Sequence, residues 1–128
     1  MINDETLLLQ MTRVKLEAAG HEVRTRETGS EGLAICPEWS PGLILLDYNL
    51  RKDGPEVTAV DYIPEFKRVC GEDVPIIVVS ATKKRLSPVE LQVADVILID
   101  LNNGFKWSIL VPTVEKYLSL AAQQSRVS

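Results

Sequence analysis

The sequence predicts an α/β fold in which helices cover both faces of a parallel sheet. Three short apolar runs, at residues 43–46, 75–79 and 96–99, are rich in branched side chains. Such continuous runs are typical of strands that are buried on both faces. Helical patterns lie between these runs, and alternating strands and helices imply parallel strands joined by right-handed crossovers.

The first part of the chain predicts a helix, an edge strand and a second helix. Residues 5–19 carry apolar side chains at the spacing of one helix face, namely Leu7, Met11, Val14 and Ala18. Gly20 stands where that helix would end. Residues 22–26 are more polar and alternate, which indicates an edge strand. Thr28 and Glu31 predict a capping box for a short second helix that Pro37 ends.

Three more helices are predicted in the rest of the chain. One lies within residues 57–70, where Pro64 leaves its start open, and a short one lies near residues 88–93. The last covers residues 107–122, and its apolar face consists of Leu110, Val114, Tyr117, Leu118 and Ala121. We therefore expect one domain over residues 1–122, followed by a flexible tail at residues 123–128.

Length, composition and charge argue against several classes of protein. The 128 residues suit one domain with one core, and the net charge of −4 provides no basic face for nucleic acid. No apolar run is long enough to span a bilayer, and no signal peptide is visible. Cys36 and Cys70 lack metal-binding spacing, so we expect them to be reduced core residues. A cytoplasmic protein without membrane or nucleic-acid partners fits best.

Polar residues follow the three apolar runs. Asp47, Ser80 and Asp100 each come directly after a strand that is predicted to be buried from solvent. In parallel α/β sheets, binding sites form at the carboxyl ends of the strands. We therefore expect these three residues to converge on one crevice.

The motifs resemble one known family. Asn3-Asp4-Glu5 opens the first helix, Asp47 ends its strand, Ser80-Ala81 ends the next, and Ala94-Asp95 leads into the last. Over nearly the whole chain, their order and spacing resemble the receiver domains of two-component response regulators. The resemblance implies a flavodoxin-like fold with five parallel strands in the order 2-1-3-4-5.

The first strand of that fold should lie in the centre of the sheet and end just before Asn3. Only Met1 and Ile2 are available for it. A missing central strand would leave backbone groups of its neighbours without partners. We therefore expect that the chain start is truncated or misassigned, or that a partner segment fills the gap.

The resemblance also implies a chemistry. Asp47 would accept a phosphoryl group from a histidine kinase or a phosphotransfer protein, and Ser80 would hydrogen-bond that group as the switch. Asp4, Asp47 and the backbone carbonyl of Asn49 would hold Mg²⁺, a cation that prefers oxygen ligands. A downstream protein partner would read the switch, and we expect a signalling protein rather than an enzyme.

Two positions depart from the family pattern. Asn3 replaces one of the two acidic residues that normally open the metal site, which weakens metal binding. Asp100 stands where the family has a lysine, so it adds repulsion in place of attraction. The pocket would then need either a higher metal affinity or a cation supplied by Lys83 or Lys106. The alternative function is therefore a pseudo-receiver, a protein-interaction module that signals without phosphate.

Other interpretations of these residues remain open. Asp47 could be a turn residue and Asp4 could simply cap the first helix. A cofactor-binding enzyme is less favoured, because His21 is in the wrong context for a cobalamin ligand and the acidic Asn3-Asp4-Glu5 segment would repel a flavin phosphate. For output, we expect homodimer or partner contacts through a face that carries Leu86, Leu91, Trp107 and Leu110.

Overall fold

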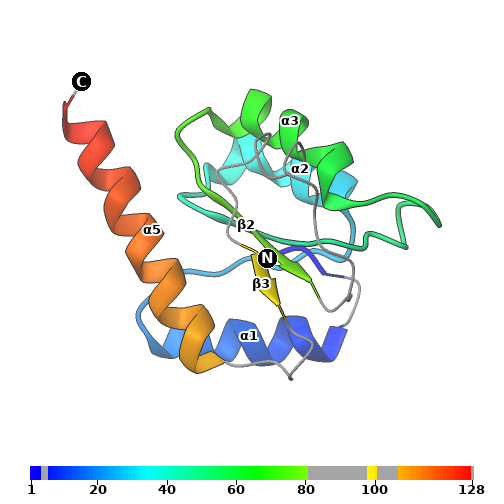
Figure 1. The fold of residues 1–128 in the computed structure, drawn as a ribbon, viewed down its shortest axis with the longest axis horizontal. Helices are drawn as coiled ribbons and strands as arrows, with labels where there is room; N and C mark the ends of the chain where they lie inside the picture. The colour runs from blue at the N-terminus through cyan, green and yellow to red at the C-terminus, as the bar shows by residue number, and fades with distance from the viewer. Residues whose placement is uncertain (4–5, 81–97, 101–106, 128) are drawn as a thin grey trace.

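The computed structural model describes residues 1–3, 6–80, 98–100 and 107–127, and for residues 80, 98–100, 107–109 and 122–127 it describes the backbone alone. The predicted short helix at residues 88–93 lies outside these ranges. The elements follow the order α1 (Thr6–Ala18), α2 (Gly29–Trp39), β1 (Ile44–Asp47), α3 (Ala59–Cys70), β2 (Ile76–Ser80), β3 (Leu98–Asp100) and α5 (Trp107–Val127). Figure 1 shows α2 and α3 on one face of the sheet and α1 and α5 on the other.

The three strands form a parallel sheet in the order β1-β2-β3, with Ile44 opposite Ile76 and Val78 opposite Leu98. Alternate residues of β1 and β2 enter two separate cores. Ile44, Leu46, Ile76 and Val78 pack with buried residues of α2 and α3, whereas Leu45, Ile77 and Val79 pack with buried residues of α1 and α5. The strands are therefore covered on both faces, as the apolar runs predicted.

The central place in the sheet is filled by the first three residues. Ile2 forms parallel bridges to both Arg26 and Leu46. Its N–H donates to the Leu45 carbonyl at 2.8 Å, and its own carbonyl accepts from the Asp47 N–H at 2.9 Å. Segment 22–26 therefore lies beside residues 1–3, which lie beside β1. This arrangement confirms the order 2-1-3-4-5.

The expected gap is partly closed. Residues 1–3 take the place of the central strand and pair with both neighbours only at Ile2, which agrees with the predicted truncated first strand. The predicted edge strand at residues 22–26 is reduced to a single bridge at Arg26. A strand forms where its backbone groups are paired, and among the described residues Ile2 alone bridges to this segment.

The buried face of α1 differs from the prediction. Leu7, Met11 and Val14 are exposed, at 69%, 42% and 64%, while the helix buries Leu9, Thr12 and Leu16. Both sets have helical spacing. Thr12 is fully buried yet polar, so the true inner face was less apolar in sequence than the outer one.

The end of α2 differs from expectation, whereas α3 lies within its predicted range and its start is now defined. Pro37 lies inside α2, which continues to Trp39 and ends at Ser40 in a left-handed conformation with φ 53°. At its start, Thr28 Oγ1 accepts from the Glu31 N–H at 3.1 Å, as the capping motif predicted. Pro64 lies in the interior of α3, which begins at Ala59. The last helix, α5, extends from Trp107 to Val127.

Cys36 and Cys70 are free thiols, as predicted, and they lie together between α2 and α3. Burial, followed by the neighbouring Cys36, raises the pKa of the Cys70 thiol to about 12. The Cys70 thiol is therefore protonated at neutral pH. In the part of the chain that the structure describes, no helix is both long enough and apolar enough to cross a bilayer.

Candidate functional site at the carboxyl edge of the sheet

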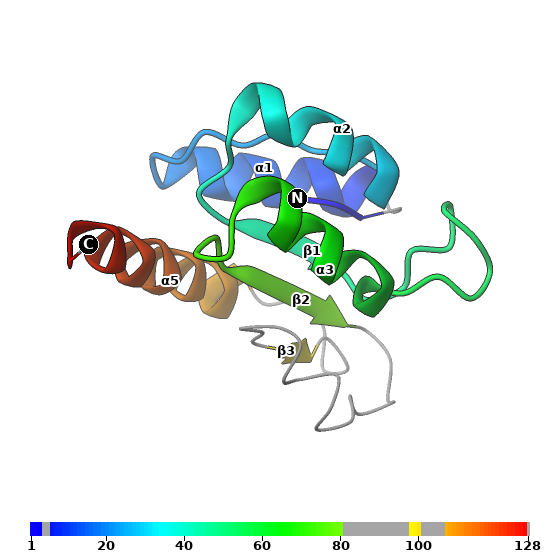
Figure 2. The same cartoon turned by 90° about the horizontal axis from the view of Figure 1, so that it is seen from above.

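The strand register brings the predicted site residues to one edge of the sheet. Asp47, the last residue of β1, lies opposite Val79, so Ser80 is one step further along β2. Ser80 in turn lies opposite Asp100, the last residue of β3. Neighbouring strands are about 4.8 Å apart, so these positions lie side by side. Figure 2 shows β2 and β3 ending at the same side of the molecule.

Asp47 lies at the end of a firmly held strand. Its N–H donates to the Ile2 carbonyl, and the next residue, Tyr48, donates to the Val79 carbonyl at 2.9 Å. Leu46 and Tyr48 on either side are buried, while Asp47 itself is half-buried. The carboxylate therefore stands on a rigid backbone at the surface of the sheet edge.

Asn49 lies two residues after the end of β1. Asn49 and Thr58 form an antiparallel bridge. The hydrogen bonds of this pair come from its neighbours, Leu50 N–H to Val57 at 3.0 Å and Ala59 N–H to Tyr48 at 2.8 Å. In such a pair the residue's own carbonyl points away from the facing strand. The Asn49 carbonyl is therefore directed away from residues 57–59.

The donor atoms fit magnesium by their chemistry. Asp47 offers a carboxylate and Asn49 a carbonyl, and both are oxygen donors of the kind that Mg²⁺ prefers. Asp4, the third predicted ligand, lies outside the described residues. Among the residues that the structure describes, no three His, Cys, Asp or Glu side chains cluster as a metal site.

Asn3 lies beside this edge and is buried, with only 2% of its surface exposed. An amide here contributes no charge, whereas a carboxylate would attract a cation. Asp100, the other departure, lies in register with Ser80. The two unusual residues therefore occupy the strand ends around Asp47.

A residue that the sequence reasoning missed holds the neighbouring loop. Asp53 accepts hydrogen bonds from the Gly29 N–H at 2.8 Å, the Ser30 N–H at 3.3 Å and the Tyr62 hydroxyl at 2.9 Å. It thereby joins the loop that follows β1 to the start of α2 and to α3. Partial burial alone would raise the pKa of Asp53, but these hydrogen bonds lower it below its ordinary value of 3.8.

We expect Asp53→Asn to destabilise the fold by about 1.5 kcal/mol, because it weakens charge-assisted bonds to α2 and α3 in a partly exposed position. A lowered pKa means that the wild-type advantage is present above pH 3.8 and is lost as the pH falls through the folded pKa. Urea unfolding at pH 7 and at pH 3 measures both effects. Asp73→Asn, at an exposed position before β2, is the matched control. Equal stability of the two variants at pH 7 would contradict the role given to Asp53.

The structure differs in part from the predicted output face. Leu110 is buried, so it cannot contribute to an exposed contact face. Leu86 and Leu91 lie outside the described residues, and of Trp107 only the backbone is described. The large exposed apolar side chains among the described residues are three on α1 and one on α5, namely Leu7, Met11, Val14 and Leu120.

Comparison with known proteins finds this fold in solved structures but finds no match by sequence. No protein-family model matches the sequence, and no curated protein matches it. Among solved structures, NtrX from Brucella abortus in complex with ADP has a TM-score of 0.83 and 23% identity over 98% of this chain. A CheY-like response regulator receiver domain from Methanospirillum hungatei has a TM-score of 0.78 and 20% identity over 96% of this chain and 94% of its own.

A third similar structure is the response regulator TrrA from Thermotoga maritima in complex with Mg²⁺ and BeF, with a TM-score of 0.74 and 22% identity over 91% of this chain. The chain therefore has the fold of response-regulator receiver domains, which confirms the predicted flavodoxin-like class. It spans 28% of the length of the NtrX chains that it matches and almost all of the single-domain regulators.

Proposed function

We propose that this chain is a phosphoacceptor receiver domain of two-component signalling, acting in the cytoplasm, and that Asp47 is the acceptor. The observation that carries the proposal is the strand register, which aligns Asp47, Ser80 and Asp100 along the carboxyl edge of a receiver fold. The donor would be a phosphohistidine of a kinase or of a phosphotransfer protein. The role is signalling rather than enzymatic.

In the proposed reaction an oxygen of the Asp47 carboxylate attacks the phosphorus, and the bond between phosphorus and the histidine nitrogen breaks. The product is an acyl phosphate on Asp47, and the histidine leaves with a proton from solvent. Attacker and phosphoryl group are both negative, so Mg²⁺ held by Asp4, Asp47 and the Asn49 carbonyl would offset the repulsion. Ser80 would donate a hydrogen bond to the phosphoryl group.

Mg²⁺ binding is part of the proposal because the donor atoms at the edge are oxygens, and because the similar TrrA structure contains Mg²⁺ with BeF. Two residues weaken the site. The Asn3 amide removes one negative charge from the metal side, and Asp100 adds one near the phosphoryl side. These residues favour the second candidate function, a pseudo-receiver that binds partners without being phosphorylated.

A downstream partner or a second copy of the chain would read the state of the domain. The exposed apolar residues Leu7, Met11 and Val14 provide a contact surface on α1, in place of part of the predicted face.

The experiment is phosphorylation by a small donor such as acetyl phosphate, followed by intact mass. We expect the chain to gain one phosphoryl group with Mg²⁺ and none when the metal is chelated, because without a cation the carboxylates and the phosphoryl group repel each other. Uptake without metal would contradict the assignment of Asp4, Asp47 and Asn49. If the chain gains nothing with Mg²⁺ present, it is not a phosphoacceptor, and the pseudo-receiver function replaces the proposal.

A further inference from the structure

The two helices on one face of the sheet, α2 and α3, pack against each other in a defined register. Gly29 lies against the Tyr62 ring, because a Cβ atom at Gly29 would come within 2.8 Å of three carbons of that ring. One turn further along both helices, a Cβ atom at Gly32 would lie 3.3 Å from the Phe66 ring. The two helices therefore run in the same direction, with matching positions side by side.

The next pair in this register is Cys36 on α2 and Cys70 on α3. Steps of three and four residues along α2, and of four and four along α3, keep the members of each helix on one face. The two thiols are hydrogen-bonded to each other. Cys36 is buried, with 5% of its surface exposed, whereas Cys70 is half-buried at the end of its helix. The thiol pair is therefore in contact and can be reached by small molecules from the Cys70 side.

The glycines of α2 favour a short distance between the helix backbones. Packed helices usually lie about 8–10 Å apart, and the side chains at the contact set this distance. Gly29 and Gly32 place no side chain between α2 and α3, so the backbones approach closely there. A disulfide needs Cα atoms about 4.4–6.8 Å apart, which closely packed helices provide. The same register that puts the thiols in contact therefore suits a bond between them.

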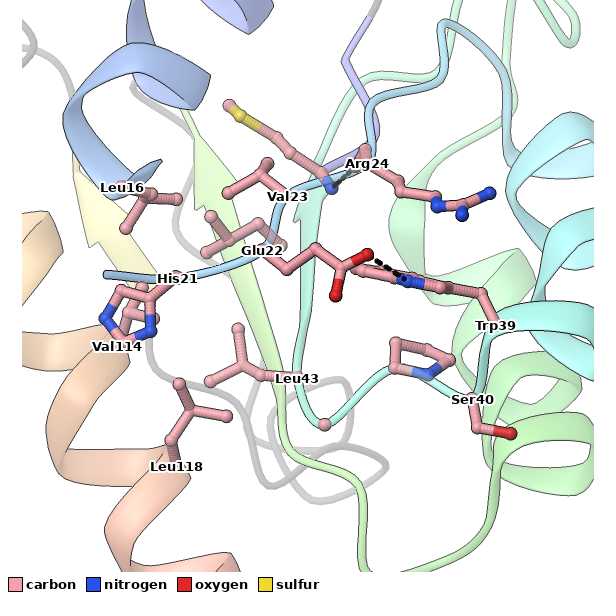
Figure 3. A pocket seen from close by; sticks show the side chains of 14 residues that line it. Leu16, His21, Glu22, Val23, Arg24, Trp39, Ser40, Leu43, Val114 and Leu118 are labelled. Atoms are coloured by element: carbon pink, nitrogen blue, oxygen red, sulfur yellow. Dashed lines mark hydrogen bonds between the residues drawn. The ribbon is translucent and has the colours of Figure 1, made fainter. Parts of the chain in front are cut away.

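The last turn of each helix is held in place by polar contacts. At the end of α2, Trp39 Nε1 donates to a carboxylate oxygen of Glu22 at 3.2 Å, as Figure 3 shows. At the end of α3, Lys67 Nζ donates to the Val74 carbonyl at 2.9 Å. These contacts fix the two helix ends that carry the thiols, so the pair stays together in the folded chain.

We propose that Cys36 and Cys70 form a redox-modification site, at which a peroxide converts the thiol pair into a reversible disulfide. The bond joins α2 to the end of α3 and closes a loop that contains β1 and Asp47. Asp53 already ties the first turns of the same two helices through its hydrogen bonds. The disulfide adds a covalent tie at their other ends, and its formation does not depend on the chemistry of Asp47.

The reaction balances with hydrogen peroxide as the oxidant. The sulfur of Cys70, the more exposed thiol, attacks one peroxide oxygen, so that an S–O bond forms, the O–O bond breaks and water leaves with the thiol proton. The sulfur of Cys36 then attacks the sulfur of Cys70, the S–O bond breaks, and a second water leaves with the Cys36 proton. Two thiols are oxidised to one disulfide while one peroxide is reduced to two waters. A dithiol reductant reverses the change by thiol–disulfide exchange.

The first step is slow at neutral pH. The thiolate is the attacking form of cysteine, and burial, followed by the neighbouring Cys36, raises the pKa of Cys70 to about 12. Sustained exposure to peroxide is therefore needed to form the disulfide, and oxidation is best measured over hours at mildly alkaline pH.

The test uses the full chain, incubated with hydrogen peroxide and followed by intact mass. We expect the loss of two hydrogen atoms from a chain that stays monomeric, and recovery of the original mass with dithiothreitol. Peptide mapping should find Cys36 joined to Cys70. The oxidised chain should melt about 5–10 °C higher than the reduced chain, because the closed loop restricts the unfolded state.

The matched variants are Cys36→Ser and Cys70→Ser. Neither can form the internal bond, and Cys36→Ser should instead carry a sulfenic acid on Cys70 that a dimedone probe traps. A comparison of the wild type with and without urea keeps the test decisive if a serine variant does not fold. The bond should form faster in the native chain, because the fold holds the thiols together. Bond formation only in urea, oxidation of native thiols without an internal bond, or a lower melting temperature of the oxidised chain would each overturn the proposal.

Discussion

Asp47→Asn is expected to take up no phosphoryl group from a small donor, whatever the Mg²⁺ concentration. The substitution removes the carboxylate oxygen that attacks phosphorus and replaces it with an amide of nearly the same shape. It also removes one of the proposed metal ligands, so both the nucleophile and part of the metal site are lost together. Intact mass after incubation with the donor measures the result, with wild type treated in parallel.

The matched control is Asp73→Asn, which makes the same chemical change at an exposed position before β2. It should take up phosphate as the wild type does. Thermal melting of both variants verifies that they are folded. Phosphate found on folded Asp47→Asn would show that another side chain is the acceptor and would refute the assignment of the edge of the sheet as the phosphorylation site.

The strands could be predicted because their signal is local. Ile44 to Leu46 and Ile76 to Val79 are apolar at every position, and the structure buries both sets on alternate faces. The polar residue after each run marked the carboxyl edge, because parallel strands end on one side. Sequence was therefore sufficient for β1 and β2 and for placing Asp47 and Ser80 at the same edge of the sheet.

Features that depend on distant partners could not be predicted. The buried face of α1 is chosen by contacts with β1 and α5, and its fully buried member Thr12 carries no apolar signal. Asp53 meets Gly29 and Tyr62 only in the folded chain, and in sequence it looks like an ordinary turn residue before Gly54.

Asp100→Lys is expected to lengthen the lifetime of the phosphorylated state, or to create that state if the wild type lacks it. Asp100 lies in register with Ser80, one strand away from the proposed phosphoryl position. Two like unit charges at about 4 Å repel by roughly 4 kcal/mol at an effective dielectric of about 20, and a lysine turns this repulsion into attraction. Solvent screening reduces the net gain to about 1 kcal/mol, which corresponds to a roughly fivefold change.

The measurement is the decay of phosphorylated protein after removal of the donor, followed by intact mass over time. Asp73→Lys makes the same change of charge at the exposed position before β2, so it controls for the net charge of the chain. A longer lifetime in Asp100→Lys alone would show that the local charge at the end of β3 controls the state. If Asp100→Lys is phosphorylated and the wild type is not, Asp100 prevents phosphorylation of an otherwise complete receiver pocket. The wild-type chain is then a pseudo-receiver. Equal behaviour of wild type and both lysine variants would place Asp100 outside the pocket.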